Sequence, residues 1–149
     1  MNSLTYFTLD RDVRQVRGSE VEALAAQISG GLVIAGDPGY EDARKVWNAT
    51  VDRRPAAIAR CLNESDVQAA VCFAAEHRML LSVRSGGHHN AGNAVAEGGM
   101  MLDLSGMRAI TIDAEKRTAR VGGGALLGNY SGMNLNIEPA AVPQHRGAS

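Results

Sequence analysis

The strongest constraint on the fold is a glycine pair that directly follows a short apolar run, within residues 80–92, LLSVRSGGHHNAG. The segment LLSV is typical of a buried strand, and this pattern stops at Arg84. Gly86 and Gly87 carry no Cβ atom that would keep a ligand away from the backbone. Their N–H groups can converge on an anion. The sequence therefore predicts a strand that ends in an anion-binding loop.

Polar side chains flank the glycine pair on both sides. The forked guanidinium of Arg84 suits phosphate oxygens, and Ser85 adds a hydroxyl donor. His88 stands where a more distant part of the ligand could reach it. The spacing alone equally allows a plain glycine turn that ends a strand and leaves Arg84 in solvent.

The segment 56–84 predicts a strand–helix–strand unit. Residues 56–62 form a buried strand, with Ile58 and Leu62 as its larger members, and Asn63 or Ser65 caps the following helix. An apolar stripe at helical spacing marks that helix: Val67, Ala70, Val71, Ala74 and Ala75. A strand at 80–84 follows after a short link, which predicts a parallel crossover. The glycine loop then lies at the carboxyl end of a parallel strand, where ligands usually bind.

The residues before this unit predict fewer elements. Residues 1–18 form a loose lead-in, and Ser19 opens a helix through a capping box with Glu22. A strand is expected at 32–34 and a helix at 41–47. Tyr40 and Trp47 are expected to be packing residues, and the pair at 53–54, Arg-Arg, is expected to be solvated.

The residues after the loop predict three short strands, at 100–104, 110–113 and 118–121, as an antiparallel meander. Asp103 is interpreted as a turn-capping residue at a strand end. The triple glycine at 122–124 is either a turn or a second backbone approach to a ligand, and a short helix is expected at 125–130.

Several of these segments together resemble a known family. The string RSGGH at 84–88, Gly92, the strand at 100–104 and VGGG at 121–124 resemble the FAD-binding domain of berberine-bridge-enzyme-like oxidases. These belong to the vanillyl-alcohol-oxidase and p-cresol-methylhydroxylase (PCMH) group of flavoproteins. The resemblance covers residues 55–130 well and 39–48 weakly. It implies an α/β (α+β) fold, in which a small parallel βαβ subdomain followed by the meander forms the first half of a PCMH-type FAD-binding domain.

The resemblance also implies a function: FAD-linked hydride transfer from a small organic substrate to the flavin, with dioxygen as acceptor. A dehydrogenase of the same group is the related alternative. Residues at the matching positions would hold the cofactor: Arg84, Ser85, Gly86 and Gly87 at the diphosphate, Gly92 at a close approach of the loop, and His88 at the flavin ring. In relatives that attach flavin covalently, the position of His88 carries the bond. No catalytic base is assigned.

The tail at 131–149 has no periodicity and departs from the family pattern. We therefore expect three parts: a lead-in at 1–54, a partial FAD-binding domain at 55–130 and an irregular tail at 131–149. The family pattern predicts that the chain is a truncated form. The alternative is a non-catalytic remnant or interaction module that does not retain FAD.

Composition excludes several other classes. The 149 residues carry a net charge of −1, which does not indicate nucleic acid or an anionic membrane as partner. The two cysteines are predicted to be free, buried thiols of a cytoplasmic protein. The four histidines lack ligand spacing, so no metal site is predicted. Neither the substrate nor the oligomeric state is indicated by the sequence.

Overall fold

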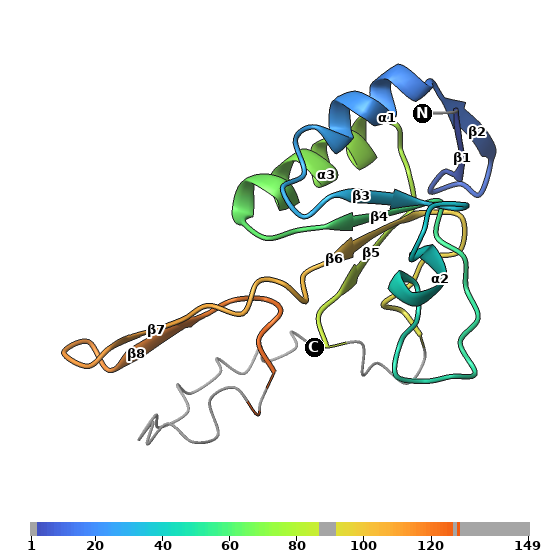
Figure 1. Ribbon diagram of the computed structural model, residues 1–149. Coiled ribbons are helices and arrows are strands. Elements are labelled where there is room, and N and C mark those ends of the chain that lie inside the picture. Colours follow the sequence, from blue (N-terminus) through green and yellow to red (C-terminus); the bar gives the residue numbers. More distant parts are fainter. Residues whose placement is uncertain (1–2, 87–91, 127, 129–149) are drawn as a thin grey trace, which may run out of the picture.

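The computed structural model of the chain describes residues 3–86, 92–126 and 128. The elements follow in the order β1 (Leu4–Phe7), β2 (Val13–Val16), α1 (Gly18–Ala25), β3 (Leu32–Ile34), α2 (Tyr40–Ala43), β4 (Ala57–Arg60), α3 (Glu64–Glu76), β5 (Leu81–Arg84), β6 (Met100–Asp103), β7 (Ile110–Asp113) and β8 (Thr118–Val121). Figure 1 shows α1 and α3 over one face of a central sheet and α2 on its other side. Among the described residues, none of the helices has the length and apolar character needed to cross a membrane.

The central sheet has the strand order β3-β4-β6-β5. Strands β4 and β5 both run parallel to β6, and β3 runs antiparallel to β4. Side chains of β4 and β6 alternate between two apolar clusters: Ala59 and Leu102 pack beneath α1 and α3, whereas Ile58 and Met101 pack with Tyr40 of α2. Burial on both faces is what a parallel sheet requires. The predicted α/β (α+β) class is confirmed.

The predicted strand–helix–strand unit is confirmed as β4, α3 and β5. The two strands are parallel but not direct neighbours, because β6 lies between them. Asn63 is the N-cap of α3, and its side-chain oxygen accepts a hydrogen bond of 2.9 Å from the Asp66 N–H. This cap fixes the point at which the chain leaves the sheet and enters the helix.

The buried face of α3 differs from the predicted apolar stripe. Ala70 and Ala74 are buried as expected, but Val71 is 41% exposed and Ala75 is exposed. The buried face begins instead at Asp66, which is 1% exposed. A count of apolar residues could not find this face, because its first member is a carboxylate whose hydrogen-bond partners lie elsewhere in the chain.

The prediction of a loose lead-in at 1–18 is wrong for the residues that the structure describes. Strands β1 and β2 pair antiparallel, with Leu4 opposite Val16. Leu4, Tyr6 and Val16 are all buried, so the hairpin adds to the main apolar cluster. Four-residue strands offer too few alternations for the pattern to stand out against the charged residues around them.

The helix boundaries were also predicted imperfectly. Helix α1 begins at Gly18, with Arg17 at the N-cap and no side-chain cap, so Ser19 lies inside the helix and not at a capping box. The predicted helix at 41–47 is the single turn α2. Tyr40 is buried, but Trp47 is 70% exposed, so the expected packing role holds for the tyrosine only.

Two further burial predictions are corrected by the structure. Leu62 lies beyond the end of β4 and is 52% exposed. Both cysteines are free, but only Cys61 is buried, whereas Cys72 is exposed on α3. Each of these residues was assigned from apolar character alone, which does not say on which side of an element a side chain falls.

The predicted meander is correct for its last two strands only. Strands β7 and β8 form an antiparallel hairpin, which Figure 1 shows projecting from the central sheet. Strand β6 is instead a central member of the parallel sheet. Its four residues are all buried, and such a continuous buried run is typical of a parallel strand covered on both faces. The helix predicted at 125–130 falls largely outside the described residues.

Candidate functional site

The site predicted from the sequence lies at the carboxyl edge of the parallel sheet. Strands β5 and β6 pair in register, so that Arg84 stands beside Asp103 at the end of the two strands. Ser85 and Gly86 follow directly and are exposed. Gly87 and His88 lie outside the described residues. The expected position of the glycine loop, after a parallel strand, agrees with the end of β5.

Arg84 turns inward, toward four acceptors of the protein itself. Its Nε and Nη2 atoms donate to Oδ1 and Oδ2 of Asp103 at 3.3 and 2.5 Å. Its Nη1 atom donates to the carbonyl oxygens of Ala43 at 2.6 Å and Lys45 at 2.8 Å. Only 13% of the Arg84 side chain is exposed. Direct contact between Arg84 and a diphosphate stays a prediction, and these bonds give Arg84 a structural task as well.

Asp103 is ionised by this arrangement. Burial opposes its ionisation, but the hydrogen bonds and charge of Arg84, together with the Ser105 N–H at 3.0 Å, outweigh burial and hold the Asp103 pKa below its ordinary value. The bond to Ser105 confirms the interpretation of Asp103 as a turn-capping residue. Its pairing with Arg84 was not predicted.

A cavity of about 150 Å³ opens at this edge, beside the exposed residues that follow β5. Its lining contains three cationic side chains, two serines and no carboxylate among the described residues: Lys45, Val46, Arg84, Ser85, Gly86, Ser105, Arg108, Gly124 and Leu126. Such a set of donors suits a phosphate or diphosphate anion. The volume matches a part of a dinucleotide and not the whole molecule, so the residues present fit the phosphate portion of FAD.

Gly92 has a conformation that favours glycine, with φ of +70°. A Cβ atom built on it would lie 2.7 Å from both Cγ atoms of Val51. Its carbonyl oxygen accepts from Arg53 at 2.9 Å, and Arg53 also donates to the Val95 carbonyl at 3.2 Å. Gly92 is therefore required for local packing, and its approach to a cofactor stays a prediction. The expectation that Arg53 lies in solvent is wrong, because Arg53 holds the segment after the loop.

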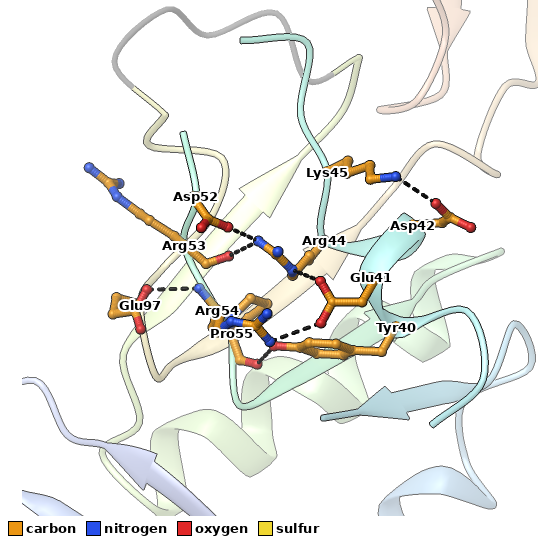
Figure 2. A network of polar contacts seen from close by, with 10 residues as sticks. All are labelled: Tyr40, Glu41, Asp42, Arg44, Lys45, Asp52, Arg53, Arg54, Pro55 and Glu97. Atoms are coloured by element: carbon orange, nitrogen blue, oxygen red, sulfur yellow. Dashed lines mark hydrogen bonds and ion pairs between the residues drawn. The ribbon is translucent and has the colours of Figure 1, made fainter. Parts of the chain in front are cut away.

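A polar network connects α2 to the segment before β4 (Figure 2). Arg44 donates to Glu41 at 2.7 Å and to Asp52, and Arg54 donates to Glu41 at 2.9 Å. The Arg54 N–H in turn donates to Glu97 at 2.7 Å. Arg54 is thus paired as well, but its side chain is 55% exposed, so the prediction of a solvated arginine is correct for Arg54. The network therefore holds three segments in place relative to one another: α2, the segment just before β4, and residues 92–97.

The triple glycine at 122–124 packs against the chain that leaves β6. A Cβ atom on Gly122 would lie 2.2 Å from the Met107 carbonyl oxygen, and one on Gly124 would lie 1.8 Å from the Leu104 carbonyl oxygen. The Gly124 N–H donates to the Met107 carbonyl at 2.9 Å. Of the two predicted interpretations, a turn in close contact with backbone describes this segment, and Gly124 also lines the cavity.

Three polar residues of the cavity lining were not predicted from the sequence: Lys45, Ser105 and Arg108. Each lies just beyond the carboxyl end of α2 or β6. The continuous apolar run of β6 was a signal that could have located the residues after it. Such a run is typical of a parallel strand, and a parallel strand beside β5 would place the residues that follow β6 at the carboxyl edge of the sheet.

Known proteins are similar to this chain in sequence and in fold. A family model described as "FAD binding domain" matches residues 55–131, slightly more than half of the chain. The chain is 38% identical over 120 residues to (R)-6-hydroxynicotine oxidase of Paenarthrobacter nicotinovorans, covering 80% of this chain and 26% of that protein. It is 39% identical over 98 residues to the FAD-linked oxidoreductase hasG of Aspergillus fumigatus, covering 66% of this chain and 21% of that protein.

A solved structure agrees with these sequence relationships. The crystal structure of 6-hydroxy-D-nicotine oxidase from Arthrobacter nicotinovorans superimposes with a TM-score of 0.65 at 39% identity, covering 68% of this chain and 22% of that one. The chain thus spans about a quarter of the length of these relatives. The alternative of a non-catalytic module is not favoured by such relatives. This chain belongs to the FAD-binding domain family of FAD-linked oxidoreductases, among the proteins similar to berberine bridge enzyme.

Proposed function

We propose that the chain holds the diphosphate of FAD at the carboxyl edge of β5 and β6, as part of an oxidase for a small organic substrate. One observation carries this proposal: the cavity after β5 brings cations and hydroxyl groups together without a facing carboxylate among its described lining residues. The proposal includes dioxygen as electron acceptor and a cytoplasmic location. A relative named as an oxidase supports the choice of oxidase over dehydrogenase.

Different residues of the cavity supply the hydrogen-bond donors and the positive charge that bind the diphosphate. Ser85 supplies a hydroxyl donor, and Gly86 leaves the backbone accessible beside it. Lys45 and Arg108 supply positive charge. Bound FAD supplies the hydride-accepting chemistry, and the protein contributes binding, orientation and exclusion of water. We further propose, on the family resemblance, that Gly87 extends the phosphate contact and that His88 is the residue of covalent attachment.

Binding of FAD is tested by titration of the purified chain. Arg108→Gln is expected to weaken binding about tenfold, since it removes one charge-assisted hydrogen bond to the diphosphate. Arg14→Gln is the matched control, because it removes the same charge from the exposed part of β2, far from the cavity in sequence. Equal affinities of the two variants would contradict the assignment of the cavity.

Covalent attachment is tested separately. The protein is precipitated with acid, washed, and measured for flavin absorbance in the pellet. Flavin that stays with the wild type and is lost with His88→Ala supports attachment through His88, and His89→Ala serves as the neighbouring control. Flavin retained by His88→Ala, or lost with His89→Ala alone, would contradict the assignment to His88.

A further inference from the structure

We propose that Arg84 is a positioning residue that acts through Asp103 and two backbone carbonyls, and that the charge at the phosphate site comes from Arg108 and Lys45. The inference rests on the proposed function, because it concerns how the cavity is shaped for the same anion. It assigns Arg84 a task different from the direct phosphate contact that its place in the sequence predicts.

Arg84 already donates most of its hydrogen bonds to groups of the protein itself. A guanidinium has five N–H donors. Four of them are directed at acceptors of the protein: two at the carboxylate of Asp103, and two at the carbonyl oxygens of Ala43 and Lys45. A ligand phosphate could take over the two donors at Asp103 only by leaving a buried carboxylate without its cation, which is strongly unfavourable. It could take over the other two only by leaving the Ala43 and Lys45 carbonyls without their donor.

The three cations around the cavity differ in how far their charge is neutralised. The Arg84 charge is neutralised at close range by Asp103, whose side chain is 7% exposed. Arg108, in contrast, donates from Nε to a neutral group, the Ser105 carbonyl, at 2.6 Å. Lys45 pairs with Asp42 at 2.8 Å, but both side chains are largely exposed, and such pairs are weak. The attraction for an anion therefore comes mainly from Arg108 and Lys45.

Two of the Arg84 hydrogen bonds connect the end of β5 to the end of α2. Ala43 is the last residue of α2, and helix-end carbonyls lack partners within the helix. Arg84 satisfies the Ala43 carbonyl and the Lys45 carbonyl beyond it. Lys45 and Val46 line the cavity, and so do Ser85 and Gly86, which follow Arg84 directly. One guanidinium thus fixes two segments of the cavity wall that are about 40 residues apart in sequence.

The first experiment needs no ligand. Hydrogen exchange of the backbone amides is measured in the wild type, Arg84→Gln, Asp103→Asn and the double variant. Arg84→Gln removes the bonds to both carbonyls and is expected to speed exchange about tenfold at residues 43–47 and not in the β1–β2 hairpin. Asp103→Asn leaves those bonds but frees the guanidinium that makes them, so a smaller increase is expected at the same residues. The double variant should match Arg84→Gln, because Asp103 acts on these residues through Arg84. Unchanged exchange at 43–47, or a uniform rise over the whole chain, would overturn the proposal.

The conservative variant Arg84→Lys keeps the experiment decisive if Arg84→Gln does not fold. Arg84→Lys keeps the charge and the pairing with Asp103, but an ammonium cannot reproduce the fork that reaches both carbonyls. Exchange at 43–47 should be intermediate in Arg84→Lys. If Arg84→Gln does not fold, Arg84→Lys decides alone: faster exchange at 43–47 supports the proposal, and wild-type exchange overturns it.

The second experiment separates positioning from direct contact with phosphate. The dissociation constant of ADP is measured from about 50 to about 500 mM NaCl, since salt screens charge attraction. Arg84→Gln should weaken binding and keep the wild-type salt dependence, whereas Arg108→Gln should reduce that dependence. A reduced salt dependence in Arg84→Gln would make Arg84 a phosphate ligand and overturn the proposal. Absence of ADP and FAD binding in the wild type would refute the proposed function, and the exchange experiment would still decide the role of Arg84.

Discussion

Two buried carboxylates lie near the carboxyl edge of the central sheet, and their surroundings differ in one decisive respect. Asp66, after β4, accepts from neutral donors among the described residues, including the N–H and hydroxyl of Ser29 at 3.0 and 2.9 Å and the Leu62 N–H at 2.8 Å. Asp103, at the end of β6, is paired with the cation of Arg84. With neutral donors, Asp66 stabilises a turn. Asp103 instead holds the Arg84 guanidinium of the neighbouring strand β5, which contacts a residue that lines the cavity.

The pKa values of Asp66 and Asp103 are both lowered, but by different contacts. Burial raises the pKa of both carboxyl groups, but other contacts outweigh it in each case. For Asp66 the hydrogen bonds from Leu62 and Ser29 hold the pKa below its ordinary value, and for Asp103 the contact with Arg84 does so. Both groups are ionised near neutral pH, yet only Asp103 is linked to the candidate site.

The largest expected effect is on stability, at Asp66. Asp66→Ala should lower the free energy of unfolding by about 3 kcal/mol, because it leaves several buried donors without an acceptor. Asp66→Asn, which keeps the shape and one oxygen, should cost less. Denaturant unfolding gives both values. FAD affinity of the folded Asp66→Asn protein should stay within about twofold of the wild type, and a larger loss would remove the contrast with Asp103.

The free energy of unfolding at acid pH should depend on both carboxylates, Asp66 and Asp103. A carboxyl group whose pKa is lower in the folded state stabilises the protein above its ordinary pKa, near 3.8, and this contribution is lost as pH falls through the folded-state value. The free energy of unfolding should therefore decline as pH falls below about 4. Asp66→Asn and Asp103→Asn should each flatten part of the decline, measured by denaturant unfolding at several pH values. An unchanged slope in both variants would show that other groups govern acid unfolding.

The same contrast explains what could be predicted from the sequence. The strand, helix and glycine loop around Arg84 follow from local patterns: an apolar run, an N-cap at Asn63 and a glycine pair. These patterns involve neighbours in sequence, so they located β4, α3 and β5 correctly. The family resemblance then supplied FAD, which the comparisons support.

Partners that are far apart in sequence could not be predicted in this way. Asp66 and Ser29 are 37 residues apart, and Arg84 and Ala43 are 41 apart. The first contact depends on the pairing of β3 with β4, and the second joins the end of β5 to the end of α2. No local period in the sequence connects these segments. The cavity residues Arg108 and Lys45 were missed for the same reason. Local pattern predicts elements, whereas the pairing of strands decides which polar groups meet.

A smaller effect is expected at the turn that Asp66 closes. Asn63→Ala removes the N-cap of α3, whose oxygen accepts from the Asp66 N–H, and should cost about 1 kcal/mol. The Asp66 carboxylate keeps its bonds to Ser29 and Leu62, so the loss should stay below that of Asp66→Ala. Thermal and denaturant unfolding measure it. Asn63→Asp, which retains a capping oxygen, is the control, and a loss as large as that of Asn63→Ala would exclude capping as the cause.

The smallest expected effect is on the reactivity of the Cys61 thiol, which lies near Asp66 and Asp103. Burial, and then the negative charges of Asp66 and Asp103, raise the pKa of the Cys61 thiol to about 11. At about pH 8 only ~0.1% of Cys61 is therefore thiolate, so an alkylating reagent should modify exposed Cys72 and spare Cys61 in the folded protein. The Cys72→Ser variant should then show almost no labelling, and rapid labelling of Cys61 in it would contradict the burial.

In the Cys72→Ser background, labelling of Cys61 measures how often this region opens. Asp66→Ala should speed it more than Asn63→Ala, in the order of their expected stability losses. Asp103→Asn should speed it less than Asp66→Ala, because the Cys61 N–H is bonded to the Asp103 backbone carbonyl at 2.9 Å, which this substitution keeps. The reverse order would show that the pair formed by Asp103 and Arg84, and not the turn at Asp66, holds this part of the sheet closed.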